Sequence, residues 1–138
     1  MFIILIVFLG IAVGMHVISS RKNIQVYKET NGVIRSQLDL NKVKEAINIS
    51  MRFAMIYIGV FIVFIILLIA AWRSGESFMN GVLAMFLFGV ITLPLGLAGK
   101  HFEKKIRKMT VEADDPRLEQ TYRKYLKMWD QPRFQLPE

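Results

Sequence analysis

The stretch Phe53–Trp72 reads FAMIYIGVFIVFIILLIAAW and contains no Asp, Glu, Lys or Arg. Two further stretches, Met1–Ser20 and Ser77–Gly99, also lack these four residue types. Each stretch has about the ~20 residues that an α-helix needs to cross the ~30 Å hydrocarbon core of a bilayer. None of them alternates apolar with polar residues, which is the pattern of a membrane β-barrel strand. We therefore predict an all-α integral membrane protein with three transmembrane helices.

Between the first two spans, residues 21–52 form a loop in which we expect an amphipathic helix. Its apolar positions recur three or four residues apart, as on one face of a helix: Leu40, Val43, Ile47 and Met51. This helix either lies on the membrane surface or runs straight into span two. Before it, Asn31-Gly32 either ends a helical continuation of span one or forms the turn of a hairpin between residues 23–28 and 33–38. We favour the helix.

The basic tail, residues 100–138, contains a helix signal of its own. Asp115 followed by Pro116 is typical of an N-cap and a first helical position, and Pro132 should end the helix. One face of this helix is apolar and rich in aromatic residues: Leu118, Tyr122, Tyr125, Leu126 and Trp129. The small part of the chain outside the membrane can hardly cover this stripe, so we expect it to dock on a partner subunit or on a second copy. Binding to the membrane surface is the alternative.

Lys and Arg are concentrated in two of the segments outside the spans. The loop of residues 21–52 holds seven basic and three acidic residues, and the tail holds ten basic residues. The turn of residues 73–76, between spans two and three, holds only Arg73 and Glu76. Because cytoplasmic segments carry the Lys/Arg excess, we expect the loop and the tail in the cytoplasm and the N-terminus outside the plasma (inner) membrane. The stretch Met1–Ser20 has no basic residue before its apolar run, which favours a retained span over a signal peptide.

The excess of positive charge lies next to the predicted spans, which favours anionic lipid over nucleic acid as its partner. The densest basic cluster follows span three: Lys100, Lys104, Lys105, Arg107 and Lys108.

Glycines predict where the spans pack closely. Gly10 and Gly14 form a GxxxG motif, which places both on one helix face and lets a second backbone approach, either within the chain or from another copy. Gly81 and Gly89 offer similar packing positions on span three.

The spans contain no carboxylate, Lys or Arg, and the whole chain has no Cys. We therefore expect neither catalysis nor a metal site. One alternative uses the two histidines: His16 and His101 both lie near the predicted cytoplasmic ends of their helices, which suits the axial ligands of a b-type haem.

The remaining polar residues of the spans leave a further alternative, an oligomeric channel or transport component. Tyr57, Asn80 and Thr92 are the polar residues that could line such a path, and Pro94 beside Thr92 should kink span three. The carboxylates and basic Lys or Arg residues that usually mark an ion path are missing from the spans. The interpretation we favour is a small non-catalytic membrane subunit, or an assembly or scaffold protein, of a larger or homo-oligomeric membrane complex.

Overall fold

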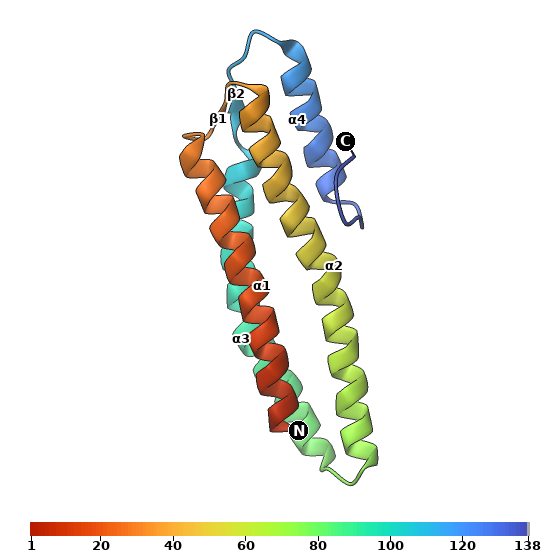
Figure 1. The fold of residues 1–138 in the computed structure, drawn as a ribbon. Coiled ribbons are helices and arrows are strands. Elements are labelled where there is room, and N and C mark those ends of the chain that lie inside the picture. Colours follow the sequence, from red (N-terminus) through yellow and green to blue (C-terminus); the bar gives the residue numbers. More distant parts are fainter. Residues whose placement is uncertain (138) are drawn as a thin grey trace.

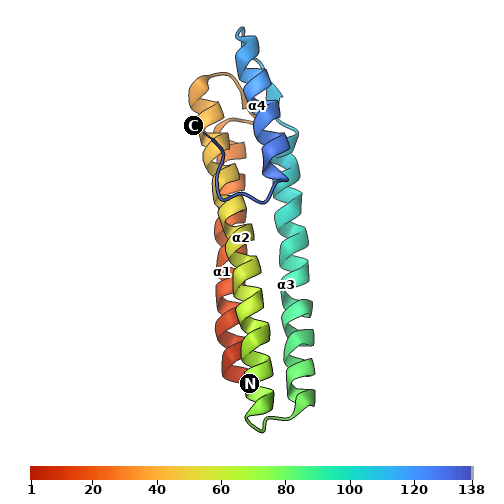
Figure 2. The same cartoon turned by 90° about the vertical axis from the view of Figure 1, so that its right-hand side faces the viewer.

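Three long helices dominate the computed structural model, which describes residues 1–137. Helices α1 (Phe2–Glu29), α2 (Gln37–Arg73) and α3 (Phe78–Arg107) are each long and apolar enough to cross a membrane. They run side by side along the molecule (Figures 1 and 2). Each contains one of the charge-free stretches, apart from Met1 and Ser77, which directly precede α1 and α3. The chain is thus a multi-pass helical membrane protein.

All three helices extend well beyond their apolar stretches, α3 as far as Arg107. Helix α1 continues to Glu29 and ends there because Asn31 (φ 52°) and Gly32 (φ 72°) adopt left-handed backbone angles. The hairpin alternative for this segment is therefore wrong. Helix α2 begins after Ser36, whose Oγ accepts a hydrogen bond from the Asp39 amide. It then continues without a break to Arg73, so the expected loop helix runs straight into span two.

The extended helix ends are joined by a short strand pair and a fourth helix. Strand β1 (Val33–Ile34) pairs in parallel with β2 (Thr110–Val111). Helix α4 (Pro116–Trp129) starts at an N-cap Asp115 whose carboxylate accepts from the Arg117 amide, and it lies beside the adjoining part of α2 (Figure 2). We call this end of the molecule the cap; it consists of residues 21–52 and 100–137.

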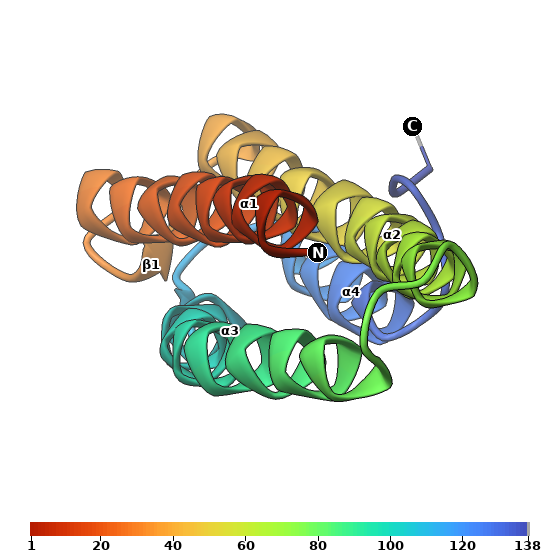
Figure 3. The ribbon, with the colours of Figure 1, turned by 90° about the horizontal axis from the view of Figure 1, so that it is seen from below.

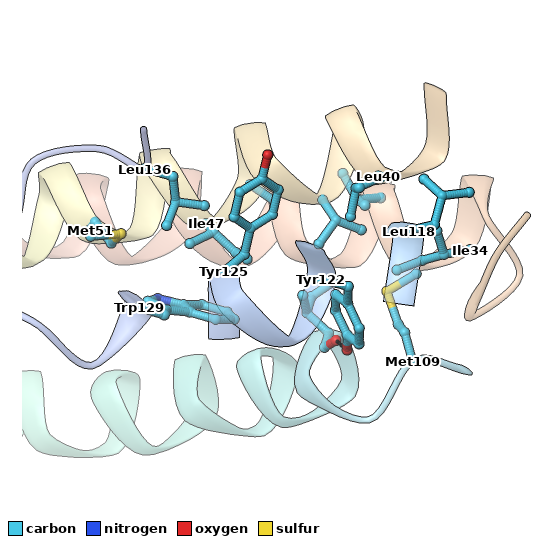
Figure 4. Packing of buried hydrophobic residues seen from close by; sticks show 14 residues of the cluster. Ile34, Leu40, Ile47, Met51, Met109, Leu118, Tyr122, Tyr125, Trp129 and Leu136 are labelled. Carbon is cyan, nitrogen blue, oxygen red and sulfur yellow. Dashed lines mark hydrogen bonds between the residues drawn. The ribbon is translucent and has the colours of Figure 1, made fainter. Parts of the chain in front are cut away.

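The cap has a hydrophobic core that draws on all its elements (Figure 4). Ile47 of α2 and Ile106 of α3 are fully buried in it, together with the apolar face of α4. The Tyr122 hydroxyl donates a hydrogen bond to the Ile106 carbonyl near the end of α3, and the Met109 amide donates to the same carbonyl at 3.4 Å. The core comprises Val26, Ile34, Leu40, Val43, Ala46, Ile47, Met51, Ile106, Met109, Leu118, Tyr122, Tyr125, Trp129 and Leu136.

A second core lies between the spans and is centred on stacked aromatic rings. Phe64 of α2 packs on Phe88 of α3 with ring centroids 4.8 Å apart, and Phe8 of α1 packs on Phe64 at 5.4 Å. Helix α1 contacts both neighbours extensively, whereas α2 and α3 contact each other much less. Viewed along the bundle, the three helices stand at the corners of a triangle, with α4 beyond the side between α2 and α3 (Figure 3).

The glycines that pack inside the chain are mostly not the ones that the motif predicts. A methyl group added at Gly10, Gly14 or Gly89 would meet no atom within 4 Å, so within this chain these three are not close-packing positions. The GxxxG face of α1 is turned away from α2 and α3. Instead, α1 approaches α3 closely at the glycines of α3. Gly81 lies near Met1, and Gly96 and Gly99 continue this contact with α1 toward the cap.

Candidate functional site

The apolar face of α4 is covered by the chain itself. Four of its five residues are less than a tenth exposed, and the fifth, Leu126, packs partly buried against the same core. The expectation that the chain cannot cover this stripe is therefore wrong. The reason is that α2 extends beyond the membrane stretch and offers Leu40 and Ile47 as a partner surface (Figure 4). Val43 of α2 belongs to the same core. The docking face predicted on Leu118, Tyr122, Tyr125, Leu126 and Trp129 is not a free surface.

The basic cluster after span three has divided roles. Arg107 is engaged within the cap: its guanidinium lies 4.4 Å from the centre of the Trp129 ring and pairs with Asp130 at 2.8 Å. Lys105 Nζ lies over the rings of Tyr27 and Phe102, at 5.7 and 5.6 Å.

The other cations of the cluster sit differently. Lys104 and Lys108 are exposed on the cap. Lys100 lies nearest the spans and lines a hollow between the helices.

The two histidines do not share a cavity. His16 packs edge-on against Tyr57, with ring centroids 5.6 Å apart, and lies beside Gly96 of α3. His101 is exposed, packs on Phe102 and does not line the hollow that His16 lines. Within residues 1–137 the structure contains no group of three or more His, Asp or Glu side chains arranged to hold a metal ion.

The main hollow of the molecule lies where the spans enter the cap, and we call it the cleft. Helix α1 forms its floor and α2 and α3 form its walls, and these two helices contact each other less than either contacts α1. Its central part has a volume of about 630 Å³. A hollow of about 240 Å³ adjoins it toward the span core, and one of about 330 Å³ adjoins it toward the cap, ending at the turn after α4. The central part is lined by Met15, His16, Ser19, Ser50, Phe53, Ala54, Tyr57, Ile58, Lys100 and Glu103.

The cleft floor carries a small hydrogen-bonded group of neutral polar side chains. Ser19 Oγ and Ser50 Oγ lie 3.0 Å apart, and Asn23 Nδ2 donates to Ser50 Oγ at 3.4 Å. Asn23 is 1% exposed, and its Oδ1 has no hydrogen-bond partner among the described residues. This group ties α1 to α2 at the level where the cleft opens. The sequence carries only a faint signal for it, namely two serines and one asparagine close to the ends of charge-free stretches.

The cleft wall formed by α3 carries two opposite charges. Lys100 and Glu103 are three residues apart, so they lie on one face of the helix. Lys100 is exposed and Glu103 is half-buried. In the described part of the chain, neither forms an ion pair or a side-chain hydrogen bond, in contrast to Arg107 one turn further on. A sequence reading groups Lys100 with the other cations and gives Glu103 no role.

The chemistry of this arrangement suits binding. Apolar walls meet hydroxyl, imidazole and charged groups at one end, and the volume is in the range of ordinary ligand sites. Thr92, on the span side, is occupied otherwise: its hydroxyl donates to the Phe88 carbonyl at 2.8 Å. Helix α3 continues through Pro94. The cleft therefore offers an amphiphile a polar end and an apolar end, along the direction of the spans.

Comparison of the chain with protein-family models, curated protein sequences and solved structures finds no match. The class follows from the fold itself: this is a helical membrane protein with three candidate spans.

Proposed function

We propose that this chain is a small non-catalytic membrane protein that binds a membrane lipid in the cleft and serves as an accessory or assembly subunit of a membrane complex. The observation that carries the proposal is the cleft itself, where unpaired charged groups stand directly above apolar walls. Lipid head groups meet their acyl chains in the same order.

We further propose that the cap faces the cytoplasm of a plasma (inner) membrane. The support is the Lys/Arg excess of the cap, compared with one Arg and one Glu in the turn at the opposite end of the bundle. In this orientation the cleft lies at the level of the cytoplasmic leaflet. Anionic lipids of that leaflet would be attracted by the exposed Lys104 and Lys108.

The subunit role is supported by the face of α1 that the chain leaves open. Gly10 and Gly14 lie one turn apart on this face, and neither has an intramolecular neighbour within 4 Å of its missing methyl group. Such a pair lets another helix approach at short range. The neighbour would be a second copy or another membrane subunit.

A steric block of the cleft tests lipid binding. Ala54 of α2 lines both the central part of the cleft and its cap-side hollow, so the indole of Ala54→Trp would occupy the cleft. Ile56→Trp is the matched control, because residue 56 lies two positions further along α2, on another face, and is 45% exposed. Both variants and the unaltered chain are purified in mild detergent, and the phospholipid retained per protein is measured by mass spectrometry.

We expect the unaltered chain and Ile56→Trp to retain stoichiometric lipid, and Ala54→Trp to lose most of it. Equal retention by all three proteins would contradict the proposed function.

A further inference from the structure

We propose that the cleft selects a phosphoethanolamine head group, with the lipid phosphate at Lys100 and the ammonium at Glu103. This inference rests on the proposed lipid-binding function and adds the chemical class of the ligand. Its starting point is that these two opposite charges line one hollow, one helical turn apart, without pairing to each other.

The carboxylate of Glu103 decides between head groups. A half-buried carboxylate without a partner is costly, and a cation that donates hydrogen bonds would relieve that cost. On the cap side of Glu103, Arg107 already pairs with Asp130 through two hydrogen bonds of 3.2 and 2.8 Å. The Arg107 guanidinium also stacks on the Trp129 ring, and within the described residues it forms no hydrogen bond with Glu103. The carboxylate of Glu103 is therefore open to an external cation.

The other charged groups at the cleft agree with a zwitterionic ligand. The cap-side hollow contains Glu103 and Arg107 from α3, and Asp130 and Arg133 from the segment after α4. With Lys100 included, the lining carries three positive and two negative charges, so a ligand with a phosphate and an ammonium finds a counter-charge for each. His16 is the remaining titratable group at this level besides Tyr57, and both lie on the span side.

Other common head groups fit less well. A purely anionic head group, such as phosphatidylglycerol, would place a phosphate in the hollow and leave Glu103 facing a like charge. A choline head group carries the positive charge but has no N–H to donate. An ammonium group has three donors, as a lysine side chain does, and can serve both the carboxylate and a neighbouring hydroxyl.

The acyl chains have a path from this position. Leu93 and Leu97 of α3 line the span-side hollow and are 66% and 65% exposed. Ile58 of α2 stands on the opposite wall. A lipid whose head group lies at Lys100 and Glu103 would therefore place its chains along apolar side chains that face the bilayer.

The test uses a head-group series on the unaltered full-length chain in detergent. The lipids are dioleoyl phosphatidylethanolamine, its N-methyl and N,N-dimethyl derivatives, phosphatidylcholine and phosphatidylglycerol, and binding is measured by native mass spectrometry. We expect affinity to fall with each added methyl group, by about tenfold over the series, since one charge-assisted hydrogen bond is of that order. Equal affinity across the series, or tighter binding of phosphatidylglycerol, would overturn the assignment.

Two variants then locate the selectivity. Glu103→Gln should bind phosphatidylethanolamine and phosphatidylcholine equally, whereas the control Glu119→Gln, on the exposed side of α4, should keep the preference. Lys100→Gln should weaken all phospholipids alike, because it loses a phosphate contact. A preference that survives in Glu103→Gln contradicts the assignment of the ammonium.

The block at Ala54 separates the two proposals. If Ala54→Trp abolishes binding but the head-group series shows no preference for the ethanolamine, only the present inference fails. If Ala54→Trp leaves lipid binding unchanged, the cleft is not the lipid site and the proposed function fails with it.

Discussion

Replacing Tyr122 by phenylalanine removes one hydroxyl from the core of the cap and leaves the ring in place. Tyr122 is 4% exposed, and its hydroxyl donates to the carbonyl of Ile106. A hydrogen bond of this kind contributes about 1–1.5 kcal/mol net. We therefore expect Tyr122→Phe to lower the free energy of unfolding of the cap by about this amount at pH 8.

The pH dependence of stability gives a second, independent signature of the same hydroxyl. Burial raises the pKa of Tyr122 to about 12, whereas an exposed tyrosine titrates near ~10. Between these two values the unfolded chain has released a proton that the folded chain still holds, so the free energy of unfolding falls as pH rises. The loss is about 1.4 kcal/mol per pH unit. The Tyr122→Phe variant lacks the contribution of residue 122, and the other groups titrate in both proteins, so the two stabilities should become equal at about pH 11.

Tryptophan fluorescence follows the cap alone if the Trp72→Phe background is used, because Trp129 is then the remaining indole and lies in the cap core. Urea unfolding in micelles is recorded from pH 8 to 11.5. Tyr125→Phe is the matched control, since this ring is also buried but its hydroxyl makes no hydrogen bond within the described residues (Figure 4). Stability curves of the unaltered chain and the Tyr122→Phe variant that stay parallel over this range would refute the reasoning.

Two other perturbations test the packing and the orientation. At Gly96 an added methyl group would already touch the His16 ring at 3.8 Å, so the larger side chain of Gly96→Leu should lower the stability of the purified chain by about 1–3 kcal/mol. Gly10→Leu should leave the stability of the isolated chain unchanged and weaken its self-association or subunit binding. Equal stability losses at the two sites would contradict this packing. For the orientation, a membrane-impermeant thiol reagent added to intact cells should label Ser74→Cys and not Ser36→Cys, and the reverse pattern would invert the assignment of the cap to the cytoplasm.

The spans are predictable because a single physical requirement determines them. The ~30 Å of hydrocarbon demands about twenty apolar residues, and each charge-free stretch falls on one helix, apart from Met1 and Ser77 just before α1 and α3. The end of α1 is also determined by a local signal, since Asn31 and Gly32 adopt the left-handed backbone angles that stop a helix. The start of α4 at Pro116 follows from the preceding aspartate in the same way.

The cap and the cleft depend on contacts that no local pattern specifies. The stripe on α4 and the stripe of Leu40, Val43 and Ile47 on α2 are both visible in the sequence, yet nothing there says that each covers the other. The GxxxG motif is a visible pattern without a contact in this chain: Gly10 and Gly14 touch no other helix, and α1 instead packs closely on α3 at Gly96 and Gly99. The cleft depends on how far α2 and α3 separate, which is a property of the whole bundle.

The parallel pairing of β1 with β2 also constrains how the protein can be made. Ile34 is in register with Val111, and all of α2 and α3 lies between them in the chain. The two strands can meet only if the chain returns to the side of the membrane from which it left, whichever side that is. A chain in which one of these two helices fails to insert would leave Ile34 and Val111 on opposite sides of the bilayer, with the apolar residues of the cap exposed to water. Formation of the cap therefore requires that α2 and α3 have both crossed the membrane.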